Sequence, residues 1–238
     1  MRVLVVTAVP AERDAVTAAS PRHTEVPLPG GATLHRTARF DVLAAGVGPG
    51  AAAAGAATAL TAAELAGERY DLVVSAGIAG GFQPGAPPAS LVVSEAIVAA
   101  DLGAQTAEGF RSTAELGFGA TGHRSPEALV RAVAEATGAA RGEVLTVSTA
   151  TGTAERAAEL TARHPQALAE AMEGFGVAEA AAAHGVPVLE LRAVSNAVGP
   201  RDRAAWRIGD ALAALTDAFR RLPSAPVVPP AEKAEVTR

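Results

Sequence analysis

The chain has 238 residues, of which 49% are hydrophobic and 19% charged, a composition typical of a globular protein with one core. Its 20 basic and 25 acidic residues give a formal net charge of −5, which leaves no electrostatic footprint for nucleic acid or an anionic membrane. The absence of cysteine excludes disulfides, thiolate catalysis and cysteine-based zinc sites. Small molecules are therefore the expected partners.

Short β-branched runs alternate with long alanine-rich segments, which predicts an α/β fold in which crossover helices join the strands of one sheet. Residues 2–7 indicate a buried strand rather than a signal peptide, because the apolar run is short and no small-residue cleavage site follows it. The predicted strands are 2–7, 33–38, 41–45, 72–75, 90–98, 143–148 and 186–195. The predicted helices are 10–19, 49–65, 126–137, 153–163, 173–184 and 203–221.

Two segments between these elements lack a clear period. Residues 20–31 are rich in Pro and Gly and predict a hairpin or loop, whereas 103–125 predict a long excursion. Within it, Phe110 and Phe118 are expected either to close over a bound substrate or to pack in the core. The proline-rich tail 223–238 is expected to be disordered and outside a single domain of residues 1–222. No stretch is apolar enough to span a bilayer, so we expect a cytoplasmic protein.

Glycine is concentrated in two predicted turns, 45–50 and 75–81, each directly after a predicted strand. Glycine lacks a Cβ and tolerates positive φ, so either turn could bring backbone close to a ligand, although tight packing explains each turn equally well. The first turn misses the GxGxxG dinucleotide pattern by one residue, and the chain has no GxxxxGK[ST] element. No nucleotide cofactor is therefore expected.

Three polar side chains lie where apolar strands are expected to end: Glu12, Glu173 and Asn196. In an open α/β sheet the ligand crevice lies outside the carboxyl ends of the strands, so these three residues could face one pocket. Glu12 also has a structural explanation when it is considered alone, because the helix dipole favours a Glu in the first turn of a helix. Glu190 and Arg192 share one face of a predicted strand and indicate a structural ion pair.

The histidines show no spacing typical of a metal site, such as HExxH. We expect them to be ordinary surface or turn residues and expect no metal. They are His23, His35, His123, His164 and His184.

Five motifs follow one another along the chain, at 7–12, 46–48, 76–81, 171–173 and 192–196. In this order they resemble the purine nucleosidase and nucleoside phosphorylase superfamily over about residues 1–222, and are most similar to the futalosine hydrolases. The resemblance implies a single α/β domain with a central mixed, twisted sheet flanked by helices. It also implies a purine nucleoside substrate, no cofactor and a homo-oligomer.

Carried over residue by residue, the resemblance makes Glu12 the acid that activates water and Glu173 the carboxylate that binds the ribose hydroxyls. Asn196 becomes the catalytic residue facing the purine, where adenosine-type nucleosidases carry Asp. The other implied substrate-binding residues are Val47, Ile78, Ala79, Gly80, Thr151, Gly152, Met172 and Ser195.

The amide of Asn196 favours a 6-oxopurine, because it can donate toward N7 and O6, although an amide can also pair with adenine. Chemistry and resemblance together imply hydrolysis of the N-glycosidic bond of futalosine, which releases hypoxanthine and dehypoxanthine futalosine in the futalosine pathway of menaquinone biosynthesis. A methylthioadenosine/S-adenosylhomocysteine-type nucleosidase stays open, as does a purine nucleoside phosphorylase with Arg13 or Arg36 as phosphate ligand. A non-catalytic nucleoside-binding protein is the third alternative.

Overall fold

The computed structural model describes residues 2–222, and the tail predicted for 223–238 lies outside them. The strands are β1 (Val3–Thr7), β2 (Thr24–Pro27), β3 (Thr33–Arg36), β4 (Phe40–Ala44), β5 (Leu72–Gly81), β6 (Leu91–Ala99), β7 (Gly103–Thr106), β8 (Gly109–Ser112), β9 (Gly122–Arg124), β10 (Ala140–Thr146), β11 (Ala167–Ala171) and β12 (Val188–Ala197). The helices are α1 (Pro10–Thr17), α2 (Pro49–Leu65), α3 (Glu127–Thr137), α4 (Ala154–Arg163), α5 (Gly174–Ala183) and α6 (Ile208–Arg221), with 3₁₀ turns η1 (Pro29–Gly31) and η2 (Arg203–Ala205).

The central sheet is mixed, as the resemblance implied. Parallel strands β12, β5, β1 and β4 form its middle. Beyond β4 the sheet continues with β3 and β2, each antiparallel to its neighbour. On the other side β6 runs antiparallel to β12 and parallel to β10. Helix α2 leads from β4 to β5, the kind of crossover that parallel strands require.

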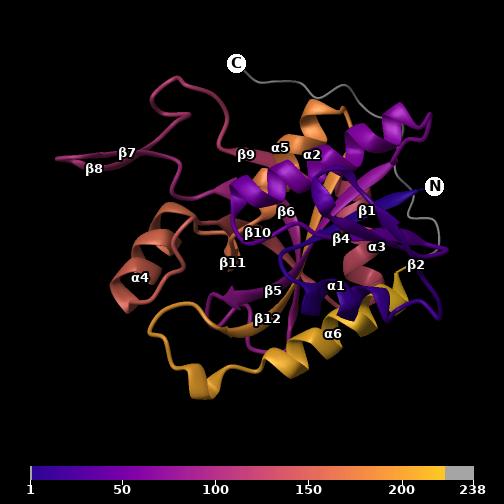
Figure 1. Cartoon of the computed structure of the whole chain (residues 1–238). Helices are drawn as coiled ribbons and strands as arrows, with labels where there is room; N and C mark the ends of the chain where they lie inside the picture. The colour runs from indigo at the N-terminus through magenta and orange to yellow at the C-terminus, as the bar shows by residue number, and fades with distance from the viewer. Residues whose placement is uncertain (1, 223–238) are drawn as a thin grey trace.

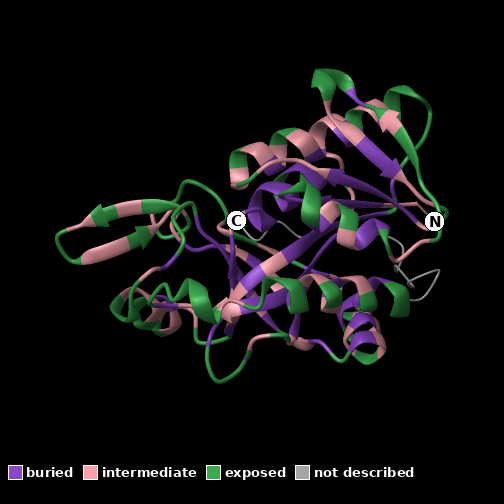
Figure 2. Cartoon of the chain, turned by 60° about the horizontal axis from the view of Figure 1, so that its bottom comes forward, coloured by how far each residue is buried: buried purple, intermediate pink, exposed green. Residues whose placement is uncertain are grey.

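Helices cover both faces of the sheet, so its middle strands are buried on both sides (Figures 1 and 2). Along β1, Leu4 and Val6 pack against α2 and α5, whereas Val5 packs on the opposite face against α3 and α6. This alternation follows from the two-residue period of a strand, and it explains why β1 is an unbroken apolar run. The folded core thus lies in two layers, one on each side of the sheet.

One part of the sheet closes on itself. β11 pairs with β10, and its end pairs with the end of β5, where Ala169 lies opposite Gly81 and Glu170 opposite Gly80. Strands β5, β12, β6, β10 and β11 therefore form a continuous ring of pairings. The open sheet assumed from the sequence is wrong for these five strands.

Several predicted boundaries are confirmed, and α2 spans the predicted residues 49–65. The turn predicted at 75–81 is wrong, because β5 continues to Gly81 with β12 paired along it and β11 paired at its end. Pairing with β12 along the segment, and with β11 at Gly80 and Gly81, outweighs the poor strand propensity of glycine. The sequence also did not predict β11, whose residues Ala167–Ala171 resemble the alanine-rich helices in composition.

The excursion predicted at 103–125 contains a separate two-stranded hairpin, β7–β8, and the short strand β9, which pairs with β6. The hairpin projects from the body of the molecule (Figure 1). Phe110 on β8 lies under the guanidinium of Arg163, 4.3 Å from the ring centroid. Phe118 is 81% exposed, so core packing is wrong for this residue.

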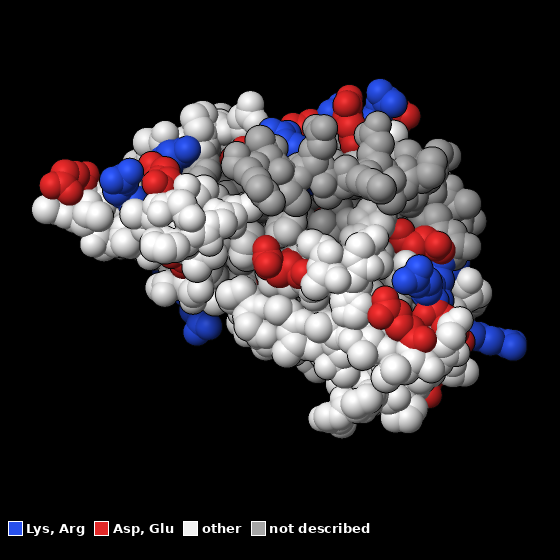
Figure 3. Space-filling view, turned by 90° about the horizontal axis from the view of Figure 1, so that it is seen from above, with Lys and Arg blue, Asp and Glu red and all other residues white. Residues whose placement is uncertain are grey.

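The surface carries charges of both signs. On the face seen in Figure 3, acidic and basic side chains lie in small groups among uncharged residues. Within residues 2–222, no helix combines the length and the apolar character that crossing a bilayer would need.

Candidate active site

Glu12 lies in the first turn of α1, directly after β1, and only 3% of it is exposed. Its Oε2 accepts hydrogen bonds from the backbone N–H of Ala8 (3.0 Å) and Val9 (3.3 Å). Its Oε1 accepts one from the N–H of Ile78 on β5 (2.8 Å). These three donors hold the carboxylate in one orientation at the end of β5.

Glu173 lies between β11 and α5, and it is 5% exposed. Its Oε1 accepts from the N–H of Gly48 (3.2 Å), and its Oε2 accepts from the N–H of Met172 (3.3 Å). Gly48 has a φ of 93° and Gly46 a φ of 108°, so the predicted need for glycine is confirmed in this turn. The turn thereby aims a backbone donor at the second carboxylate.

Arg192 on β12 joins these groups, and it is almost fully buried. Its Nη2 donates to Glu173 Oε2 (3.2 Å) and to Ser75 Oγ (3.1 Å). A Cβ added to Gly77 would lie 2.5 Å from Glu12 Oε1 and 2.7 Å from Arg192 Nη1, so the guanidinium and the carboxylate of Glu12 approach the same point of β5. The two predicted acids therefore converge on one buried cation.

Burial alone would lower the pKa of Arg192, but the carboxylates of Glu190, Glu173 and Glu12 raise it above its ordinary value. Its Nε donates to Glu190 Oε1 at 2.7 Å, so the structural pair predicted from the sequence is present. That interpretation missed the contact of Arg192 with Glu173. An arginine in a strand of mostly apolar residues was the available signal.

Asn196 lies on β12 opposite Gly80 of β5 and is half-buried. The β12–β5 register shifts between Val194 and Asn196, an irregularity of the kind that re-aims side chains next to functional sites. The amide Oδ1 accepts from Ser195 Oγ (2.7 Å), and Nδ2 donates to the carbonyl of Ala197 (2.9 Å). Asn196 is thus placed at the same end of β5 as Glu12.

Thr151 reaches this end of β5 through Glu170, a residue that the sequence analysis missed. Both the N–H of Thr151 (2.8 Å) and its hydroxyl donate to the Glu170 carboxylate. Burial raises the pKa of Glu170, although these hydrogen bonds oppose the shift. Glu170 lies opposite Gly80 from the β11 side, while Asn196 lies opposite it from the β12 side. A lone acid in the run Ala169–Ala171 was the signal for it.

The remaining predicted residues lie around this centre. The carbonyl oxygen of Ala79 lies 3.2 Å from Ser195 Oγ, whose single hydrogen is donated to Asn196 Oδ1 at the shorter distance of 2.7 Å. Met172 is half-buried beside Glu173, and a Cβ added to Gly152 would lie 3.5 Å from the side chain of Arg201. Val47 is 57% exposed in the turn that binds Glu173, which places it at the rim rather than in the centre.

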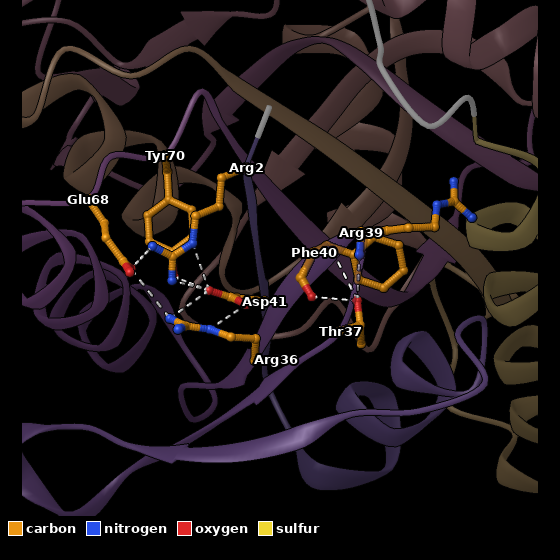
Figure 4. Close-up of polar contacts among 8 residues, drawn as sticks. All are labelled: Arg2, Arg36, Thr37, Arg39, Phe40, Asp41, Glu68 and Tyr70. Carbon is orange, nitrogen blue, oxygen red and sulfur yellow. Dashed lines mark hydrogen bonds and ion pairs between the residues drawn. The ribbon is translucent and has the colours of Figure 1, made fainter.

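The arginines considered as phosphate ligands do not join the site. Arg36 forms ion pairs with Asp41 and Glu68. Asp41 also pairs with Arg2 and accepts a hydrogen bond from the Tyr70 hydroxyl (Figure 4). Asp41 lies near the start of β4, so this cluster is at the amino ends of the parallel strands, away from the carboxylates described above. Arg13 pairs with its neighbour Asp14 at 2.9 Å.

Glu190 is fully buried, and burial raises its pKa to about 7 although Arg192 opposes the shift. Its Oε2 has no hydrogen-bond partner among the described residues. A Cβ added to Gly174 would lie only 2.1 Å from this oxygen, so a side chain at that position would clash with it. Between the ordinary carboxyl pKa and about 7, the folded state retains a proton that the unfolded state has released.

We therefore expect this carboxyl to lower stability as pH rises to about 7, by up to about 1.4 kcal/mol per pH unit. In Glu190→Gln this contribution is absent, so the variant should gain stability relative to the wild type between pH 5 and about 7. Urea unfolding at several pH values measures the difference. Parallel stability curves for the two proteins would contradict the assignment.

A family model identifies the class of protein to which this fold and this cluster of buried carboxylates belong. The family model described as the phosphorylase superfamily matches residues 2–223, and the chain belongs to that superfamily. The structure is similar to a 5′-methylthioadenosine/S-adenosylhomocysteine nucleosidase from Neisseria meningitidis, with a TM-score of 0.77 and 21% identity over 93% of this chain and 97% of the other.

Sequence relatives place the chain within this superfamily. It is 69% identical to a futalosine hydrolase of Streptomyces coelicolor, over 96% of this chain and 97% of the relative. It is 46% identical to a futalosine hydrolase of Acidothermus cellulolyticus, over 93% and 90%. The chain therefore belongs to the futalosine hydrolase family. The structure of the Helicobacter pylori futalosine hydrolase shares the fold, with a TM-score of 0.79 at 18% identity over 93% of this chain and 97% of that one.

Proposed function

We propose that this chain hydrolyses the N-glycosidic bond of futalosine and releases hypoxanthine and dehypoxanthine futalosine, a step of menaquinone biosynthesis. The observation that carries the proposal is the convergence of Glu12 and Glu173 on Arg192 at the end of β5, with Asn196 on the adjoining strand. The high identity to futalosine hydrolases supports the choice of substrate.

The two carboxylates take different parts in this reaction. A carboxylate offers about four acceptor positions, and backbone N–H groups occupy three of those on Glu12. The remaining position accepts a hydrogen from water, which Glu12 orients and deprotonates. Glu173 likewise accepts from Gly48, Met172 and Arg192, which leaves one position for a ribose hydroxyl.

Asn196 faces the leaving base. Negative charge develops on the purine as the glycosidic bond breaks through an oxocarbenium-like transition state, and catalysis requires stronger stabilisation there than in the ground state. The Ser195 hydroxyl fixes the orientation of the amide, and one of the two Nδ2 hydrogens is bonded to Ala197. The second hydrogen is available to donate to the 6-oxopurine. Ile78, Ala79, Gly80, Thr151 and Gly152 would flank the substrate, and Met172 would lie under the sugar.

Replacing Asn196 by Asp should shift preference toward an aminopurine. A protonated Asp donates to N7 and accepts from the N6 amino group, whereas a 6-oxopurine presents acceptors at both positions. The measurement is kcat/KM for futalosine and for methylthioadenosine in the wild type, Asn196→Asp and Asn196→Ala. Asn196→Ala is the control, because it shows how far loss of the amide alone lowers kcat/KM for the two substrates. An unchanged ratio of the two efficiencies in Asn196→Asp would remove the residue from base selection.

Water rather than phosphate is the nucleophile in this proposal. Arg36 is paired at the opposite end of the sheet, and a carboxylate at Glu12 repels an anion. Protein dialysed free of phosphate is incubated with futalosine, inosine and methylthioadenosine, and the free base is quantified. Fastest release of hypoxanthine from futalosine, unchanged by added phosphate, is expected. Phosphate dependence would favour a phosphorylase, and binding without base release would favour a nucleoside-binding protein.

The proposal also treats residues 1–222 as the catalytic domain of a cytoplasmic homo-oligomer. The projecting β7–β8 hairpin and the exposed side chains of Leu102 (43%) and Phe118 (81%) support contact with a second subunit, in which this segment would close over the substrate. Light scattering coupled to size exclusion gives the mass in solution.

A further inference from the structure

The hairpin β2–β3 brings together three metal-ligating side chains that the sequence analysis treated as unrelated. Glu25 on β2 lies directly opposite His35 on β3. His23 precedes Glu25 by two residues, and side chains two apart point to the same face of an extended chain. One ligand atom from each of these residues lies within 4.8 Å of the other two. A His-x-Glu segment and a cross-strand His thus form one cluster.

His35 is not the surface or turn histidine expected from the sequence, because it is only 6% exposed. Its Nδ1 lies 3.2 Å from Thr17 Oγ1. The single hydroxyl hydrogen of Thr17 is donated to the carbonyl of Arg13 at 2.8 Å, so Oγ1 accepts from Nδ1–H of His35. The lone pair of the neutral imidazole is then on Nε2. Such a hydrogen bond from the second ring nitrogen is the usual way in which a metal-ligating histidine is oriented.

The imidazole of His23 stacks on that of His35, with ring centroids 4.3 Å apart and an interplanar angle of 18°. Tetrahedral zinc needs donor atoms about 3.3 Å apart, which follows from bond lengths of about 2.0–2.1 Å. Nearly parallel stacked rings cannot both point a nitrogen lone pair at one ion, so His23 has to rotate out of this stack when the ion binds. His23 and Glu25 are exposed, so both side chains are free to rotate toward the ion. Two imidazoles and one carboxylate, with a fourth position open to water, match the donor set of known zinc sites.

We propose that His23, Glu25 and His35 bind one divalent transition-metal ion, of which Zn²⁺ is the best match, at the outer edge of the sheet. The site is separate from the proposed active site, which is built on the ends of β5, β11 and β12. A bound ion would join β2, the last strand of the sheet, to β3 and through Thr17 to α1, the helix that carries Glu12.

Metal binding by the full chain tests this proposal directly. Protein stripped with a chelator is titrated with Zn²⁺ by calorimetry and with Co²⁺ by visible absorption. We expect one ion per chain and cobalt bands of a tetrahedral site. With free Zn²⁺ about 100-fold above Kd, Tm should rise by about 5–10 °C.

Matched variants locate the site. His23→Ala and Glu25→Gln change exposed side chains, and each should weaken binding by about 100-fold or more. Thr17→Val should weaken it by about 10-fold through the orientation of His35. His123→Ala is the control, because His123 contacts a single carboxylate, Glu179, at 2.7 Å. No stoichiometric binding by the wild type at about 100 μM metal, or unchanged affinity in His23→Ala, would overturn the proposal. These readouts do not depend on futalosine hydrolysis.

Discussion

We expect Glu12→Gln to lower kcat for futalosine by roughly 10²–10⁴-fold, the range for a positioned acid or base, while substrate binding is retained. An amide cannot take the proton from water. The variant also keeps only one acceptor oxygen where the carboxylate accepts on both Oε1 and Oε2. We expect the amide oxygen to face Ala8 and Val9, which leaves the N–H of Ile78 without its partner.

Single-turnover release of hypoxanthine measures the chemical step, and calorimetry with futalosine measures binding. Glu127→Gln is the matched control, since Glu127 is an exposed acid in the first turn of α3, and its turnover should equal that of the wild type. A thermal unfolding curve for Glu12→Gln separates lost chemistry from lost folding. Turnover within a few-fold of the wild type in Glu12→Gln would exclude it as the base.

Arg192→Met should lower the free energy of unfolding by about 3–5 kcal/mol, because it leaves buried carboxylates without their counter-ion. Glu190 would lose its 2.7 Å partner and Glu173 its 3.2 Å partner. Without Arg192 the buried Glu190 must either take up a proton or carry an unpaired charge, and the double variant Glu190→Gln/Arg192→Met removes that cost, so it should be more stable than Arg192→Met alone.

Urea unfolding of the wild type, Arg192→Met, Glu190→Gln and the double variant gives four free energies, from which the double-mutant cycle yields the coupling between the pair. Arg207→Met is the control, because the Arg207–Asp210 pair has both side chains more than half exposed, at 56% and 53%. Exposed pairs contribute about 0–1 kcal/mol, so this control should unfold like the wild type. A loss below about 1 kcal/mol in Arg192→Met would show that the buried network is not coupled to folding.

Local patterns predicted much of the fold. The prolines at the start of α1 and α2 and the apolar runs of β1 and β4 fix their elements through short-range preferences. The predicted elements are wrong where the pairing of strands that are distant in sequence determines the structure. Gly77 stays in β5 because β12 pairs beside it, and Gly80 and Gly81 stay because both β12 and β11 do, which no local glycine preference reveals. The closure of five strands into a ring has the same origin.

The residues of the candidate site also fall into two groups, those that the sequence predicted and those that it did not. Glu12, Glu173 and Asn196 could be proposed from their positions after predicted strands, together with the resemblance. Arg192 and Glu170 could not be assigned to the site, because their partners are 19 residues away in sequence. The cluster of His23, Glu25 and His35 depends on the register of a hairpin that the sequence located only as a segment, so the proximity of these three residues became visible only in three dimensions.

The ring of β5, β12, β6, β10 and β11 leaves few free edges beside the two carboxylates. Amide hydrogens in this ring can exchange with solvent only when several pairings open together, so they should be among the slowest of the protein. A pocket built on such a rigid frame has little freedom to adapt its shape to a new nucleoside. Changes in substrate range during evolution would then arise mainly in peripheral segments, such as α4 and the β7–β8 hairpin, while the reacting centre stays constant.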